Sequence, residues 1–152
     1  MKKIFSLYVL VVVLLTGCGA SESKLETVTY GMDSTNGVTL NMEIKYDKDK
    51  HVQETITKNT YNYKEMGMNK EQVKEYIEKA STMYKDMSGV TDTIEYGNEE
   101  AKETLKIIVK DVSKESLPVL YSINANDDGT VSLDTLTKNF EASGFKKINN
   151  KE

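Results

Sequence analysis

The stretch VTLNMEIKY, residues 38–46, alternates without interruption between apolar and polar side chains. In an extended backbone, successive side chains point to opposite faces, so all the apolar residues of this stretch share one side. Such alternation is typical of an antiparallel strand that buries one face and leaves the other in water. The apolar set is Val38, Leu40, Met42, Ile44 and Tyr46.

Strand signals continue on both sides of this stretch. Asn36-Gly37 predicts a tight turn from a preceding strand. The following residues, HVQETITKNTYNY, are rich in β-branched and aromatic side chains, which favour a strand. The sequence GNEE, residues 97–100, predicts a hairpin turn later in the chain. The five predicted strands are Glu26–Met32, Val38–Tyr46, residues 51–63, Val90–Tyr96 and residues 104–112.

Two helices are predicted from the apolar residues at helical spacing. The first covers residues 69–87, with Asn69 and Gln72 as a capping box and Gly89 just beyond its end. The second covers residues 133–143, with Ser132 as N-cap and a Schellman ending that returns Phe145 to Phe140. The predicted buried stripe of the first helix is Val73, Tyr76, Ile77, Ala80, Met83, Tyr84 and Met87.

These elements favour an α+β fold, because strands and helices occur in runs without βαβ alternation. We expect an antiparallel sheet of about five strands with the two main helices packed on one face. Residues 113–123 are ambiguous, since Pro118 argues against a central strand there. The tyrosines are expected at the boundary between sheet and helices, with the ring buried and the hydroxyl in water.

The N-terminus resembles a bacterial lipoprotein signal. Lys2 and Lys3 precede a twelve-residue apolar run, which is too short to span a membrane. Leu15-Thr16-Gly17-Cys18 then resembles a lipobox, and this resemblance implies cleavage before Cys18 and acylation of its thiol. The alternative is an ordinary signal peptide with a chance cysteine. The lipobox interpretation accounts for the single cysteine, because acylation of its thiol leaves no free cysteine.

The predicted organisation is therefore a signal peptide at residues 1–17, lipidated Cys18 with a short tether to residue 24, and one domain at residues 25–152. Two or more acyl chains, such as palmitate, hold a protein firmly to a membrane. The predicted location is the extracytoplasmic face of the cell membrane, with membrane lipid as a partner through acylated Cys18.

Charge argues against nucleic acid as a partner. The chain has a net charge of −4, which becomes −6 when residues 1–17 and their two lysines are removed. All basic residues are lysines, whereas arginine is the usual bidentate reader of phosphate.

Two segments resemble the YehR-like family of bacterial lipoproteins. They are TYNYKEMGMNKEQVKEYIEKASTMYKDMSGVTDTIEY, residues 60–96, and DGTVSLDTLTKNFEASGFKKI, residues 128–148. The resemblance extends over nearly the whole predicted domain and carries no catalytic signature. It implies an α+β domain on a lipid anchor, of unknown activity.

Candidate ligand sites are weak in this sequence. NANDDGTVSLDT, residues 124–135, resembles an EF-hand loop, but Asn124 and Thr135 stand at positions where calcium needs carboxylates. A turn leading into a capped helix is the favoured interpretation. Met66, Met68, Met83 and Met87 could suit copper(I), although core packing is favoured for them.

The remaining polar groups give no recognisable catalytic motif. His51 is the only histidine and has no cysteine beside it for a zinc site. Glu99-Glu100 and Asp127-Asp128 are adjacent carboxylates of the kind found in solvated turns. We therefore predict no catalytic residue, no metal site and no cofactor. The favoured function is a non-enzymatic module that binds an envelope protein or small ligand; the alternative is an envelope hydrolase that uses a carboxylate pair.

Overall fold

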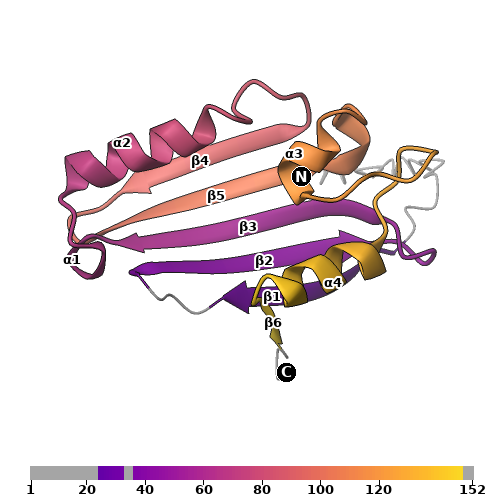
Figure 1. The fold of residues 1–152 in the computed structure, drawn as a ribbon, viewed down its shortest axis with the longest axis horizontal. Helices are drawn as coiled ribbons and strands as arrows, with labels where there is room; N and C mark the ends of the chain where they lie inside the picture. Colours follow the sequence, from indigo (N-terminus) through magenta and orange to yellow (C-terminus); the bar gives the residue numbers. More distant parts are fainter. Residues whose placement is uncertain (1–23, 33–35, 149–152) are drawn as a thin grey trace, which may run out of the picture.

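The computed structural model describes residues 24–32 and 36–148. Within these ranges the chain forms one antiparallel sheet of six strands, in the spatial order β4-β5-β3-β2-β1-β6 (Figure 1). The strands are β1 (Glu26–Met32), β2 (Val38–Tyr46), β3 (Val52–Asn62), β4 (Val90–Tyr96), β5 (Glu100–Ile108) and β6 (Lys146–Ile148).

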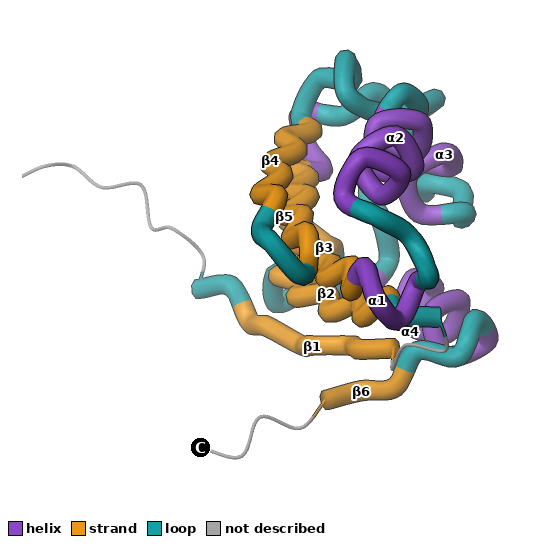
Figure 2. Tube along the Cα trace, turned by 90° about the vertical axis from the view of Figure 1, so that its left-hand side faces the viewer, coloured by secondary structure: helices purple, strands orange, loops and turns teal. Residues whose placement is uncertain are grey.

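Helices cover one face of this sheet and leave the opposite face open (Figure 2). Two of them are longer than the others, at 12 residues for α2 and 10 for α4. This arrangement confirms the predicted α+β fold with two main helices on one face. The helical elements are α1 (Tyr63–Met66), α2 (Lys70–Ser81), the 3₁₀ turn η1 (Val109–Asp111), α3 (Leu117–Tyr121) and α4 (Leu133–Ala142).

Two groups of buried side chains fill the space between helices and sheet. The larger joins β2 to α3 and α4 and contains Ile44, Leu117 and Leu136, none more than 1% exposed. The smaller lies beneath α2 and contains Val73 and Ile77, both 0% exposed. Helix α2 therefore packs on the sheet through one apolar group, and α3 and α4 pack on it through the other.

The sheet has one strand more than the five expected. Strand β6 pairs with β1 through only three residues, and its sequence carries no apolar alternation. At Gly31 the Ile148 side chain lies close to the β1 backbone: a Cβ there would lie 2.6 Å from Cδ1 of Ile148 and 2.9 Å from Oδ1 of Asn41. The strand predicted at residues 104–112 is displaced: β5 begins at Glu100, and the chain turns into η1 at Val109.

Helix α2 ends at Ser81, six residues before its predicted end. The hydroxyls of Ser81 and Thr82 donate to the carbonyls of Glu78 and Lys79, at 3.0 and 2.7 Å, so side chains compete for the backbone where the helix stops. The buried face consists of Val73, Ile77 and Ser81. The wider predicted stripe is wrong, because Tyr76, Ala80 and Met83 are exposed.

The ends of the helices follow the predicted chemistry more closely. Asn69 and Gln72 form the complete capping box of α2. Ser132 caps α4, and Phe145 donates its backbone N–H to Phe140 at 3.0 Å while the two rings lie 5.2 Å apart. The ambiguous segment around Pro118 is α3, in which the proline occupies the first turn, where no N–H donor is required.

Candidate functional site

The anchor predicted at Cys18, the signal peptide at residues 1–17 and most of the tether lie outside the described residues. Among the residues that are described, no helix is long and apolar enough to cross a membrane.

The calcium-like segment folds as a hydrogen-bonded turn. Asp128 Oδ1 accepts the backbone N–H of Thr130 at 3.0 Å and its hydroxyl at 2.7 Å. Asn126 donates its backbone N–H to the Thr130 carbonyl, and Lys114 donates to the Asp127 carbonyl. The two hydrogen bonds from Thr130 hold the pKa of the Asp128 carboxyl below its usual value. The predicted turn is confirmed, and its one carboxylate at a standard ligand position is already engaged.

The sequence candidates for hard metals and catalysis stay apart. His51 forms an isolated bridge with Ser132, and its Nδ1 lies 3.8 Å from Oδ2 of Asp47. No group of three or more His, Cys, Asp or Glu side chains able to hold a metal occurs within the described ranges. Glu99 and Asp127 are exposed in turns, as predicted for solvated carboxylates.

Methionines gather at one place that the sequence did not reveal. A cavity of about 310 Å³ opens beside the N-terminal half of α2, where β1 ends and β2 begins. We call it the methionine groove. Its lining is Met32, Asn36, Val38, Leu40, Met66, Met68 and Tyr76.

The walls of the methionine groove are partly exposed apolar side chains. The three methionines are half-buried, and Tyr76 is 50% exposed. The Tyr76 ring packs edge-on against Tyr61, with the ring centroids 6.3 Å apart. Apolar and aromatic surface at an open cavity is characteristic of ligand and peptide sites. The groove is therefore the candidate binding site of the described chain.

A buried carboxylate lies behind the groove, beneath α2. Glu103 is 2% exposed and accepts three hydrogen bonds: Oε2 from Asn59 at 2.7 Å and from Tyr61 at 2.6 Å, and Oε1 from Tyr84 at 2.9 Å. Three donors thus surround this carboxylate in place of water. Burial and the nearby carboxylate raise the pKa of both tyrosines. Tyr84 reaches Glu103 from the segment that follows the early end of α2.

A second carboxylate approaches the same cluster from the edge strand. Asp92 on β4 is half-buried, and its Oδ1 is buried without a hydrogen-bond partner among the described residues. Burial and, next, the charge of Glu103 raise the pKa of Asp92. Asp92 and Glu103 therefore form a pair of interacting carboxylates of the kind that the hydrolase alternative needs. Glu103, however, is enclosed by its three donors, so a substrate cannot reach it in this conformation.

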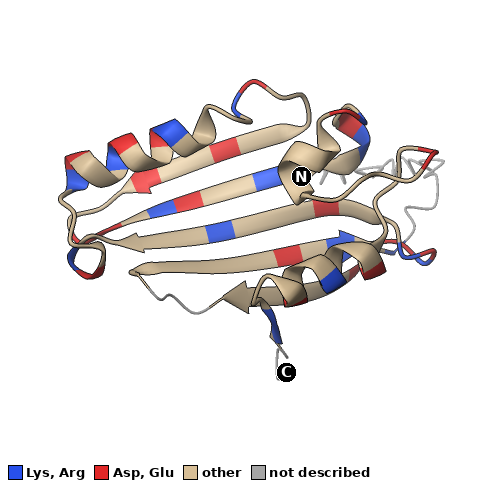
Figure 3. Ribbon diagram, in the orientation of Figure 1, with Lys and Arg blue, Asp and Glu red and all other residues tan. Residues whose placement is uncertain are grey.

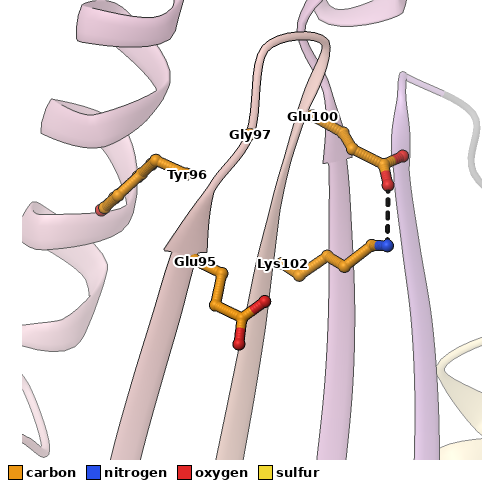
Figure 4. A pocket seen from close by; sticks show the side chains of 5 residues that line it. All are labelled: Glu95, Tyr96, Gly97, Glu100 and Lys102. Atoms are coloured by element: carbon orange, nitrogen blue, oxygen red, sulfur yellow. Dashed lines mark ion pairs between the residues drawn. The ribbon is translucent and has the colours of Figure 1, made fainter.

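A separate small pocket lies at the β4–β5 hairpin (Figure 4). Lys102 pairs with Glu100 at 3.0 Å, while Glu95 and Tyr96 point to opposite sides of β4. The side chains of Glu95 and Lys102 are exposed, so this pocket is open to solvent.

Acidic residues and lysines are interspersed along the strands and along α2 (Figure 3). On the open face, Glu54 accepts from Lys45 at 2.6 Å and from Lys106 at 2.7 Å, and these lysines lower its pKa. Acidic and basic positions alternate along α2.

The tyrosines differ from the prediction in two respects. Tyr76 is 50% exposed, whereas five of the described rings are buried in the core as expected: Tyr30, Tyr46, Tyr61, Tyr63 and Tyr121. Several hydroxyls, however, bond to protein groups instead of water. Tyr30 donates to Glu141 at 3.0 Å and Tyr46 to Glu26 at 2.8 Å. The Tyr121 hydroxyl lies 3.0 Å from that of Thr55, and burial raises its pKa to about 12. The partners of these hydroxyls lie more than 15 positions away in the sequence, so no local sequence pattern predicts these hydrogen bonds.

Comparison with known proteins identifies a family. The model of a family described as a protein of unknown function (DUF1307) matches residues 26–146. An uncharacterized lipoprotein of Listeria monocytogenes is 30% identical over 139 residues, which cover 90% of this chain and 88% of that protein. An uncharacterized lipoprotein of Listeria innocua matches with the same identity and coverage.

Two solved structures share the fold. The NMR structure of the YehR protein of E. coli superposes with a TM-score of 0.70 at 20% identity, covering 86% of this chain and 96% of that one. The NMR structure of a protein from Streptococcus pneumoniae TIGR4 gives a TM-score of 0.54 at 15% identity and 97% coverage of both. The predicted resemblance to YehR-like lipoproteins is thus confirmed.

Proposed function

Because this chain belongs to the DUF1307 family, in which two curated relatives are uncharacterized lipoproteins, we propose that it is a lipid-anchored binding module of the cell envelope. The proposal has two parts. The first is the anchor at acylated Cys18 on the extracytoplasmic face. The second is binding of an envelope protein or small ligand at the methionine groove.

The anchor is supported by the lipobox resemblance at residues 15–18 and by the names of the relatives. Mass spectrometry of protein extracted from the membrane fraction tests it. We expect an N-terminal peptide that starts at Cys18 and carries the mass of attached acyl chains. A soluble protein with an unmodified N-terminus beyond residue 18 would show that the anchor is absent.

The observation that carries the binding role is the exposed apolar wall of the groove. Val73 and Ile77 on α2 are fully buried, yet Tyr76 on the same helix is 50% exposed beside the half-buried Met66 and Met68. Leaving a large aromatic ring in water forgoes stabilisation that burial would give, about 25 cal/mol per Å² of apolar surface. A ligand that covers Tyr76 gains that stabilisation.

The groove lies far from the point where the tether joins the domain. Strand β1 begins at Glu26, beside the tether, and ends at Met32 in the groove. Seven residues of extended chain span roughly 20 Å. The groove is therefore at the opposite end of the sheet from the anchored end, where a partner can approach it without displacing the tether.

Site-specific photo-crosslinking in living cells tests the binding role. A photoreactive phenylalanine analogue at Tyr76 should give a discrete adduct. The same analogue at Glu78, which is exposed on the opposite side of α2 from Tyr76, is the matched control. We expect an adduct from position 76 and none from position 78. Equal labelling from both positions, or from neither, would argue against a role for the groove.

A further inference from the structure

We propose that the methionine groove binds one soft monovalent cation, copper(I) or its analogue silver(I), through the thioethers of Met32, Met66 and Met68. This inference rests on the proposed binding role and names the ligand class of the same groove.

The donor set of the groove selects soft metals. Thioether sulfur is a soft, uncharged ligand that prefers copper(I) over magnesium, calcium or zinc. Among the described residues that line the groove there is no carboxylate, imidazole or ammonium group. Its described lining thus offers three sulfur atoms, and its oxygen donors are the uncharged side chains of Asn36 and Tyr76, which bind divalent ions less strongly than carboxylates do.

The backbone fixes two of the three sulfur-bearing residues relative to each other. Met66 and Met68 flank Gly67, which adopts the left-handed conformation at φ 65°. The backbone N–H of Gly67 donates to Lys64 at 3.1 Å, and that of Met68 donates to Tyr63 at 3.0 Å. The capping box that begins at Asn69 then anchors the other end of this turn. Both methionines are therefore held at the groove before any ligand arrives.

Two further features favour a cation in this groove. Tyr76 presents an exposed aromatic ring at the groove, and aromatic faces attract cations within about 6 Å. The mature chain has a net charge of −6, which favours the approach of cations. Met66 and Met68 pack against the apolar group beneath α2, as predicted, but like Met32 they stay partly exposed at the groove.

Titration with silver nitrate in chloride-free buffer tests the site directly. The full chain, purified from membranes in detergent with ¹³C-labelled methionine methyl groups, would be followed by NMR. We expect the methyl signals of Met32, Met66 and Met68 to shift together and to saturate at one equivalent. The signals of Met42 and Met83, which do not line the groove, should stay in place.

Paired variants separate metal binding from folding. Met66→Leu combined with Met68→Leu keeps apolar volume but removes two sulfur atoms, so the silver affinity should fall at least tenfold. Met83→Leu is the matched control, since Met83 is 63% exposed, and it should bind as the wild type does. All variants keep the sulfur of Cys18, so any silver bound there does not change the difference in affinity between them.

Two results would overturn the metal site: an equal response of all methionines to silver, or unchanged affinity in the double variant. Neither result bears on the photo-crosslink at position 76. If that adduct persists while silver fails to bind, the groove is a binding site for another ligand and the metal assignment is wrong.

Discussion

The Tyr61 hydroxyl donates a 2.6 Å hydrogen bond to Oε2 of Glu103, and both side chains are less than 10% exposed. The pair joins β3 to β5 across the sheet, and Tyr84 adds a third element to the same carboxylate. A buried charge is tolerated only where donors replace its water shell. The cluster therefore ties the segment after α2 to the sheet.

Replacing Glu103 tests the importance of this cluster for stability. Glu103→Gln leaves one acceptor oxygen and turns an amide N–H₂ towards groups that are themselves donors. We expect a loss of roughly 3 kcal/mol in the free energy of unfolding, because hydrogen bonds to a charged group are broken and donors stay buried. Urea unfolding of the purified protein measures this loss.

Glu95→Gln is the control for that substitution, because Glu95 is an exposed glutamate on the neighbouring strand β4. Its effect should be within about 0.5 kcal/mol. If the two variants unfold at the same urea concentration, the Glu103 cluster does not stabilise the fold.

Asp92 gives a prediction of opposite sign. Its pKa is raised in the folded protein by burial and by the charge of Glu103, so ionisation of Asp92 opposes folding. The penalty is absent below the unfolded pKa of about 3.9 and develops as the pH rises through the folded pKa. Asp92→Asn is uncharged throughout, so we expect a higher melting temperature than wild type at pH 7 and no difference near pH 3.

Thermal unfolding of both proteins across that pH range decides the point. If the variant is less stable than wild type by the same margin at every pH, the charge of Asp92 does not cause the difference in stability. An inward-facing carboxylate on an edge strand also discourages pairing with other chains, so the oligomeric state should be recorded at the same time.

The elements that the sequence predicts well are those with a local signal. Strand β2 matches the alternating stretch Val38–Tyr46 residue for residue, and the caps at Asn69 and Ser132 follow from side chains within three positions. Strand β6 was missed because it is short and its partner, β1, lies more than 100 residues away in the sequence. Local patterns cannot contain that information.

The candidate site was predicted poorly for the same reason. The methionine groove joins Met32 to Met66 and Met68 across a separation of more than 30 residues. The sequence grouped Met66 and Met68 with Met83 and Met87 and left out Met32. It placed Met83 on the buried stripe because the helical spacing continues, whereas the helix stops at Ser81. The Glu103 cluster likewise draws donors from β3 and from the segment after α2.

The packing of α2 supplies a third prediction. Ile77 is 0% exposed within the apolar group beneath this helix. Ile77→Asp buries a carboxylate without a partner, and we expect the free energy of unfolding to fall by several kcal/mol. Ala80→Asp, at an exposed position of the same helix, adds the same single negative charge and is the control. Thermal unfolding compares the two, and equal melting temperatures would mean that the Ile77 face is not packed as described.

The last prediction concerns calcium at residues 124–135. We expect no tight binding, because the Asp128 carboxylate already accepts the backbone N–H and hydroxyl of Thr130. A calcium ion would have to break these bonds, and Thr135 supplies a single short hydroxyl where an EF-hand places a bidentate carboxylate. Calcium titration by NMR should therefore leave the amide signals of this loop unchanged at micromolar concentrations. Saturation with a dissociation constant below about 10⁻⁵ M, within the range of calcium sensors, would identify the loop as a calcium site despite its hydrogen bonds.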